Sequence, residues 1–379
     1  MEIRRGLPSD YDVMLNHVVQ SFRENNPCHL RFEHLFPDVI NASAETMGYW
    51  RFAFIDGEMA AGIELIPRQM KIGASEFTSG GIGNVHCWQK FRKSGCFSAL
   101  LNRIVEDMNQ EGWGLGLLGG DRTRYGNYGW ESAGVARRMN LSSHIVRFED
   151  LGPAPSVTAF RDYKGDDEDA KKMWQAHMEK NVRCTRPTLE KFKLALARPG
   201  SVTYINETTE EGFAYATVRG GSITEYAGTT AGVERILRYL LKSGGWGVEV
   251  PPVSCSGETE EMFLRYASGY GINTTAMVRV NSMCRVLNDY APWLRRRLEN
   301  WTGERIIELE DGEKVSVYRK GETMIIAETN RIANIKLTRR EVARLFFGPF
   351  MPDLGCQQED DFWRLAFPLP LFWAGPDHV

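Results

Sequence analysis

Apolar and polar positions follow two kinds of pattern along the first third of the chain. Apolar residues recur at three- and four-residue spacings over Phe97–Met108, which predicts an amphipathic helix with one buried face. Apolar runs at Phe52–Ile55 and Met59–Ile66 flank Asp56-Gly57, a dipeptide typical of a hairpin turn, and a further apolar run follows the helix at residues 114–119. The pattern therefore predicts strands and helices packed together in layers.

Residues 85–98 have the pattern of a strand, a basic turn with a glycine, and the start of that helix. The first amides of a helix lack intrahelical acceptors, and the helix dipole and two cationic side chains would add positive potential there. This combination is typical of a phosphate site and predicts a nucleotide-like cofactor. The candidate cofactor-binding residues are Val85, His86, Cys87, Arg92, Lys93, Ser94, Gly95, Cys96, Phe97 and Ser98.

A competing phosphate motif lies at Gly114-x-Gly116-x-x-Gly119, which has the spacing of the dinucleotide-binding fingerprint. That fingerprint needs a strand before the glycines and a helix after them. Here a predicted helix precedes the glycines, and they fall inside a predicted strand. The context therefore argues against a dinucleotide site.

The order of elements around the basic turn resembles a known family. A strand, the turn Arg92-x-x-Gly95, an amphipathic helix, a second strand and Tyr125-x-x-x-Gly129-Trp130 resemble the core of the GNAT acetyltransferases, which bind acetyl-CoA. Phe97 stands where that family usually has a small residue, and a bulky residue there is similar to the Eis-like branch. The resemblance implies acetyl-CoA as co-substrate.

The resemblance also implies catalytic roles. Tyr125 would be the general acid that protonates the departing thiolate, with Tyr128 as the alternative hydroxyl. The α-carboxylate of Val379 would be the base. Glu64, His86 and His378 are further residues able to take a proton, although His86 is better explained as a sheet-face or surface residue. No base adjoins Cys87, so transfer is expected to be direct, without an acyl-cysteine.

Residues 149–280 repeat the plan of the first segment more faintly. Apolar runs at Val202–Ile205 and Phe213–Val218 predict a strand pair, and a glycine-containing turn at 228–232 leads into an amphipathic helix. The turn has no Arg-Lys pair, and no counterpart of the Tyr125 motif follows. This copy is therefore predicted to pack rather than to bind coenzyme.

The predicted fold class is α+β, with two GNAT-like α/β domains and a third part. Residues 1–148 would form the N-terminal domain with the acetyl-CoA site, and residues 149–280 a degenerate GNAT-like domain, each a mixed sheet flanked by helices. Residues 281–379 predict helices, including one through Val286–Leu298, and strands, and the resemblance implies a sterol-carrier-protein-like domain. The prolines and aromatics of residues 367–379 predict a rigid C-terminal tail docked on the body.

Composition narrows the choice of partners. The net charge is −3 with both signs interspersed, so no general attraction to nucleic acid or to an anionic membrane is expected. The 7 cysteines are scattered singly, which predicts neither a metal site nor a disulfide framework. Without a signal-peptide pattern or a membrane-spanning run, a cytoplasmic location is expected.

The predicted function is acetyl-CoA-dependent N-acetylation of a primary amine on a small molecule or peptide. The alternative is a catalytically vestigial protein that binds coenzyme or lipid through its sterol-carrier-like domain. A homo-oligomer is implied by the resemblance alone. Glu24, Glu33 and Asp38 suit a cationic acceptor or a solvated helix face equally well, so the sequence leaves the acceptor open.

Overall fold

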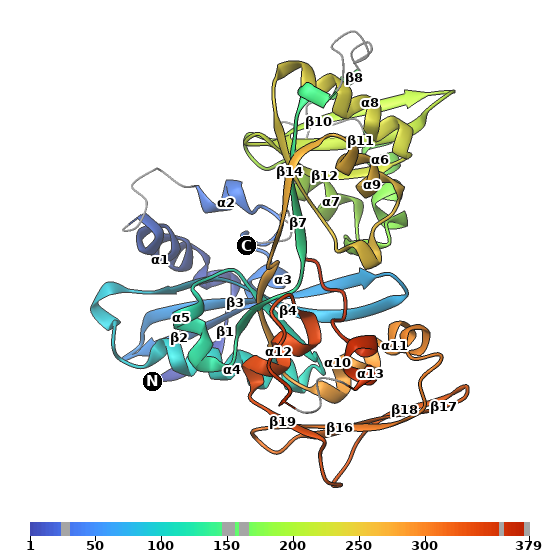
Figure 1. Cartoon of the computed structure of the whole chain (residues 1–379). Coiled ribbons are helices and arrows are strands. Elements are labelled where there is room, and N and C mark those ends of the chain that lie inside the picture. Colours follow the sequence, from blue (N-terminus) through green and yellow to red (C-terminus); the bar gives the residue numbers. More distant parts are fainter. Residues whose placement is uncertain (24–30, 146–155, 159–166, 356–359, 375–379) are drawn as a thin grey trace.

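A computed structural model describes residues 1–23, 31–145, 156–158, 167–355 and 360–374, and these form three sheets flanked by helices (Figure 1). This arrangement confirms the predicted α+β class, with mixed sheets between helical layers. Three residues named as candidates from the sequence, Glu24, His378 and Val379, lie outside the described residues.

The first sheet carries the predicted hairpin and the strand that leads into the basic turn. Its strands are, in order, β1 (Glu2–Arg5), β2 (Trp50–Ile55), β3 (Glu58–Ile72), β4 (Ser75–Cys87), β5 (Leu115–Leu118), β15 (Ala276–Val280) and β6 (Glu131–Ala133), and β9 (Val182–Cys184) pairs with β3. One face packs on α1 (Tyr11–Arg23), α2 (Phe32–Leu35) and α3 (Ala44–Tyr49), and the other on α4 (Cys96–Gln110). The buried face of α4 is the one that the apolar spacing predicted.

Strand β4 opens away from β5 after a short paired stretch. The two strands pair in parallel only over Gly80–Ile82, whereas β4 stays paired with β3 up to Cys87. The register between β3 and β4 shifts near Asn84, whose φ of 50° is positive, so β4 carries a bulge just beyond the opening. Among the described residues, the edge of β4 from residue 83 onwards therefore has no paired strand on the β5 side.

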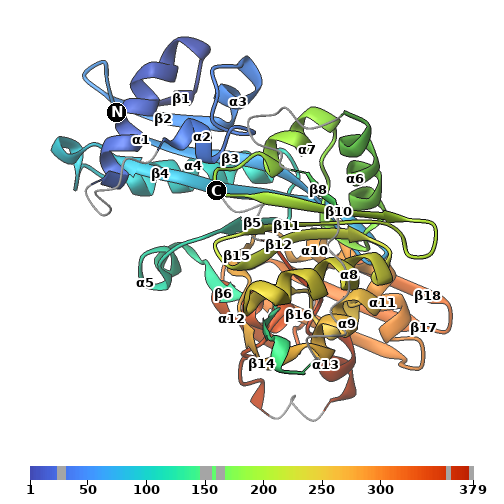
Figure 2. The same cartoon turned by 90° about the horizontal axis from the view of Figure 1, so that it is seen from above.

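The second sheet is built mostly from the second copy. Its strands are, in order, β14 (Ala267–Asn273), β7 (Ala136–Leu141), β13 (Trp246–Val250), β12 (Ser222–Gly228), β11 (Gly212–Arg219), β10 (Val202–Thr208) and β8 (Ser156–Thr158). Helices α6 (Asp167–Glu179) and α7 (Leu189–Leu196) cover one face, and α8 (Thr230–Leu240) and α9 (Glu258–Arg265) the other (Figure 2).

The two large sheets exchange strands. Strand β7 comes from the first segment but lies between β13 and β14, and β15 comes from the second segment but lies between β5 and β6. The predicted boundaries at residues 148 and 280 remain predictions. Across the first of them, the first sheet takes two strands, β9 and β15, and the second sheet takes one, β7.

The third sheet and its helices cover the end of the first. Its strands are, in order, β18 (Thr323–Glu328), β17 (Lys314–Lys320), β16 (Gly303–Leu309) and β19 (Ile335–Leu337), accompanied by α12 (Arg339–Phe347) and α13 (Asp361–Ala366). The single helix predicted over Val286–Leu298 is two helices, α10 (Met283–Asp289) and α11 (Ala291–Arg297). They break at Tyr290 because Pro292, in the first turn of α11, cannot donate a hydrogen bond into a continuing helix.

The described part of the C-terminal tail is docked on the body, as its prolines and aromatics predicted. Its apolar side chains are buried, including Leu371 and Trp373. The amide of Val135 donates to the Leu371 carbonyl at 3.0 Å, and Thr275 bonds to the backbone of Trp373. The tail therefore packs against the two segments where the chain passes between the large sheets.

Candidate functional site

No side chain in the described part of the chain caps the start of helix α4. Its N-cap residue is Gly95, with a φ of 85°, a left-handed conformation that glycine adopts without strain. The neighbouring Ser94 hydroxyl does not cap the helix, because it donates backwards to the Phe91 carbonyl at 2.6 Å. The first amides of α4 therefore remain available to a ligand.

A cavity of about 370 Å³ lies at this helix start. Its lining residues are Cys87, Phe91, Arg92, Lys93, Gly95, Cys96, Phe97 and Ser98. The structure thus brings most of the predicted cofactor-binding residues to one place and adds Phe91, an apolar residue that no sequence pattern singled out. Two cationic side chains beside uncapped amides fit the pyrophosphate of a coenzyme.

The end of β4 offers backbone groups to the same ligand. The amide of Trp88 donates to the Ala60 carbonyl of β3 at 2.9 Å. Successive amides of a strand point to opposite sides, so the amide of Cys87 points to the open edge. Burial raises the pKa of the Cys87 thiol, which keeps it protonated and unsuited to an acyl-cysteine.

Three of the predicted residues, Val85, His86 and Ser94, are not among those that line this cavity. His86 lies on the opposite face of the sheet, where its Nδ1 bonds to the Asn84 carbonyl at 3.0 Å. Its ring takes the space that a side chain at Gly62 would fill. Burial lowers the pKa of His86 to about 4, so it is neutral at pH 7. Ser94 shapes the turn through its bond to Phe91.

Tyr125 lies in the short helix α5 (Arg122–Tyr125) and is 6% exposed. Its ring packs on Phe97 at 5.7 Å between centroids, in space that Gly120 leaves open. Burial raises the pKa of Tyr125, and its hydroxyl has no hydrogen-bond partner among the described residues. By contrast, the Tyr128 hydroxyl lies 2.6 Å from Ser98 Oγ and holds the helix start.

Glu64 is the described carboxyl closest in register to the opening of β4, since its partner on that strand is Gly83. Its side chain is fully buried and accepts a hydrogen bond from Asn84 Nδ2 at 2.7 Å. Burial raises the pKa of Glu64 to about 8, although Asn84 and Arg68 favour the charged form. It can therefore exchange a proton near neutral pH.

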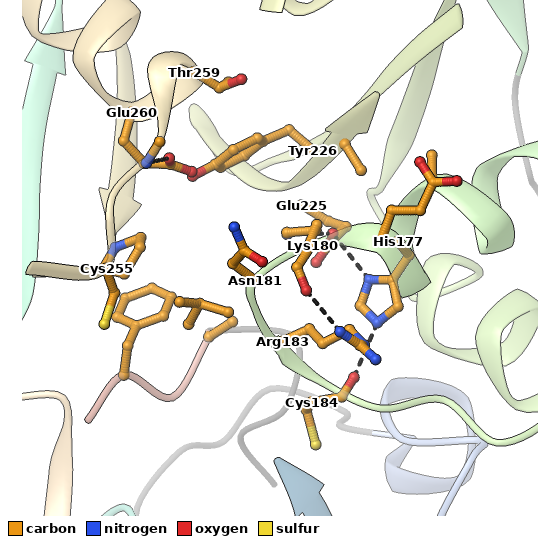
Figure 3. A pocket seen from close by; sticks show the side chains of 18 of the residues that line it. His177, Lys180, Asn181, Arg183, Cys184, Glu225, Tyr226, Cys255, Thr259 and Glu260 are labelled. Carbon is orange, nitrogen blue, oxygen red and sulfur yellow. Dashed lines mark hydrogen bonds and ion pairs between the residues drawn. The ribbon is translucent and has the colours of Figure 1, made fainter. Parts of the chain in front are cut away.

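In the second segment, residues 149–280, the helix start that corresponds to that of α4 is capped. Helix α8 is capped by its own Thr229, whose hydroxyl accepts from the Gly232 amide at 3.2 Å. A cavity of about 230 Å³ lies beside β12, and Figure 3 shows its lining. Glu225 at its wall accepts from Lys180 at 2.8 Å and also contacts His177 and Tyr215, so this carboxylate is already partnered.

Two further properties concern the described residues alone. No described group of histidine, cysteine and acidic side chains could hold a metal ion. No described helix combines the length and apolar character needed to cross a bilayer.

Comparisons with known proteins place the first segment. Residues 2–133 match the acetyltransferase (GNAT) domain model. The fold is shared with a GCN5-related N-acetyltransferase from Kribbella flavida (TM-score 0.64, 14% identity, 91% of this chain and 89% of that chain). It is also shared with Eis1 from Mycobacterium abscessus (TM-score 0.63, 11% identity, covering 97% of this chain and 96% of that chain). No curated protein matches the chain in sequence.

Proposed function

We propose that this chain, in which residues 2–133 form a GNAT acetyltransferase domain, transfers an acetyl group from acetyl-CoA to a primary amine of a small molecule or peptide. The observation that carries the proposal is the uncapped start of α4 beside the open edge of β4. The second copy has the same architecture but caps its helix with Thr229, which supports a ligand role for the first.

The chain's own residues divide the binding of acetyl-CoA between them. The first amides of α4, with Arg92 and Lys93, hold the pyrophosphate, and Gly95 keeps the turn in its left-handed conformation. The outward amide of Cys87 donates to the acyl arm and stabilises the oxyanion that develops on the carbonyl.

Transfer is direct in this proposal. The amine nitrogen forms the new bond to the acetyl carbon, the carbon–sulfur bond breaks, and the sulfur takes a proton from the Tyr125 hydroxyl. Burial keeps that phenol protonated at pH 7, because it raises the pKa of Tyr125. The amine gives up its proton to a base, for which the Val379 carboxylate and Glu64 are the two candidates.

Calorimetric titration with acetyl-CoA tests the proposal. Wild type should bind at micromolar concentration, and Arg92→Glu should lose that binding because it places a negative charge in the pyrophosphate cradle. Lys171→Glu, an equal charge reversal at an exposed position of the second unit, should bind as wild type does. No binding to wild type would contradict the proposal and favour the vestigial, lipid-binding alternative.

A further inference from the structure

A second, smaller cavity lies on the α1–α3 face of the first sheet, away from the start of α4. It has a volume of about 170 Å³ and lies between α3, the far part of β3 and the segment after β9. Asp38, Tyr49, Ile66, Arg68, Arg186 and Lys191 are among the residues that line it. Its size suits one end of a small molecule rather than a whole coenzyme.

Arg68 is the unusual residue in this cavity. It is 4% exposed, and neither its Nε nor its Nη2 has a hydrogen-bond partner among the described residues. No described acidic group lies within ion-pair distance of its guanidinium. A buried cation without a partner is costly, so an anion in the cavity would supply what the protein does not.

The neighbouring charges are already engaged with one another. Lys191 donates to Glu45, which also accepts from the Tyr49 hydroxyl at 2.8 Å. Asp38, buried rather than on the solvated face that the sequence allowed, lies 3.7 Å from Arg198. Arg68 is therefore the cation in this group that lacks a charged partner among the described residues.

The cavity lies beside the part of β3 that leads to the opening of β4, since Ile66, which lines the cavity, pairs with Gly81. Glu64, Ile66 and Arg68 alternate along β3 and so share one face of the sheet. The stem of Arg68 lies over Gly81, where a Cβ would stand 2.9 Å from Arg68 Cγ. Gly81 is two residues closer to the opening than Ser79, the register partner of Arg68. The guanidinium therefore turns toward the place where the amine would react.

We propose that Arg68 binds a carboxylate of the acceptor. The preferred acceptors are then amines that carry a carboxylate several ångströms from the reacting nitrogen. This inference rests on the proposed function. One guanidinium matches a carboxylate in charge and in its two-pronged geometry. A phosphate dianion would leave one negative charge uncompensated beside Asp38 and Glu45, so the carboxylate is favoured over phosphate.

The larger cavity beside β12 supports no equivalent proposal. Its acidic residue Glu225 is held by Lys180, and Glu260 accepts from the Tyr226 hydroxyl at 2.6 Å and from the Gly257 amide (Figure 3). Arg183 at the same wall donates to the Lys180 carbonyl at 2.6 Å. Its two carboxylates are thus partnered within the protein, and Arg183, whose Nε has no hydrogen-bond partner among the described residues, is partly exposed, unlike Arg68.

A matched pair of acceptors tests the proposal: 6-aminohexanoate and hexylamine, which differ in the terminal carboxylate. Wild type should acetylate 6-aminohexanoate with a kcat/KM about 10- to 100-fold higher than hexylamine, the range expected for one charged, bidentate contact. Arg68→Gln should abolish this preference by lowering the value for 6-aminohexanoate alone. Lys71→Gln, which removes a cation from the same strand outside the cavity, should keep it.

A binding measurement separates this proposal from the transfer reaction itself. Millimolar 6-aminohexanoate should raise the melting temperature of wild type and of Lys71→Gln, but not of Arg68→Gln. Inorganic phosphate at the same concentration should raise the melting temperature of wild type and of Lys71→Gln less than 6-aminohexanoate does. Arg68→Gln alone should melt no lower than wild type, because it removes an uncompensated buried charge.

Each outcome decides between the two claims. Carboxylate-dependent stabilisation with no acetylation would keep the Arg68 site and contradict the proposed function. Equal kcat/KM for both amines, with no shift of the wild-type melting temperature, would overturn the Arg68 site, and so would stabilisation by phosphate alone. If Arg68→Gln does not fold, Arg68→Lys keeps the charge but loses the fork and should show a reduced carboxylate preference.

Discussion

Replacing Tyr125 by phenylalanine isolates the proposed proton donor, because the change removes one hydroxyl and keeps the ring that packs on Phe97. The hydroxyl has no hydrogen-bond partner among the described residues. The free energy of unfolding should therefore change by less than the roughly 1 kcal/mol that a lost hydrogen bond typically costs. Any loss of turnover would then report on chemistry rather than on folding.

A positioned general acid contributes about 10²- to 10⁴-fold, so kcat of Tyr125→Phe should fall by that factor, or about 3 to 5 kcal/mol in barrier height. The affinity for acetyl-CoA should stay nearly unchanged, because the phenol acts mainly as the carbon–sulfur bond breaks. Steady-state kinetics with a saturating amine, together with calorimetric titration of acetyl-CoA, measure the two quantities separately.

Tyr128→Phe is the matched control from the same loop. It loses the 2.6 Å contact with Ser98 Oγ at the helix start, so it should weaken acetyl-CoA binding by up to about tenfold and leave kcat close to that of wild type. The reasoning is refuted if Tyr125→Phe turns over at the wild-type rate, and the acid role passes to Tyr128 if its variant alone loses kcat.

Three further predictions concern stability, the chain end and the turn. Burial raises the pKa of Glu64 from 4.5 to about 8, so between these pH values the native state holds a proton that the unfolded state has lost. The free energy of unfolding of wild type should therefore fall as pH rises from 4.5 to about 8. Urea unfolding at a series of pH values should show this fall for wild type but not for Glu64→Gln. Residues added after Val379 should lower kcat if its carboxylate is the base, whereas full activity of the extended enzyme in the same assay would assign the base elsewhere. Gly95→Ala should destabilise the fold by about 1 kcal/mol in denaturant melts and weaken acetyl-CoA binding, because its φ of 85° strains any residue with a Cβ.

Local patterns predicted the elements that have a strong period or a strong turn signal. The helix over Cys96–Gln110 and the hairpin around Asp56-Gly57 follow from side-chain spacing and turn chemistry, which act over a few residues. The exchange of β7 and β15 between the sheets could not be predicted in the same way. Each strand is short and apolar, and such a strand fits either sheet until distant segments fix its neighbours.

Burial of charge was also beyond the sequence. Glu64 and Arg68 lie in a strand whose alternation resembles that of many half-exposed hairpins, so their side chains could be expected to reach water. Helices α1–α3 cover that face and bury both. Strand alternation assigns residues to a face, but whether helices cover it depends on the packing of segments far apart in the chain.

The difference between the two copies rests on the residue that precedes each helix. Threonine at an N-cap satisfies one of the first amides within the chain, as Thr229 does for α8. Glycine in a left-handed conformation satisfies none, as Gly95 shows for α4, and it lets the chain turn so that the amides face outward. A helix with glycine at its N-cap is less stable than one with threonine there by roughly a few tenths of a kcal/mol, unless a ligand supplies the missing acceptor. A duplicated fold can therefore keep a coenzyme site in one copy and close it in the other through a single N-cap residue. Thr229→Gly should lower the stability of the second unit. It should not create affinity for acetyl-CoA, because the turn before α8 also lacks the two cations that precede α4.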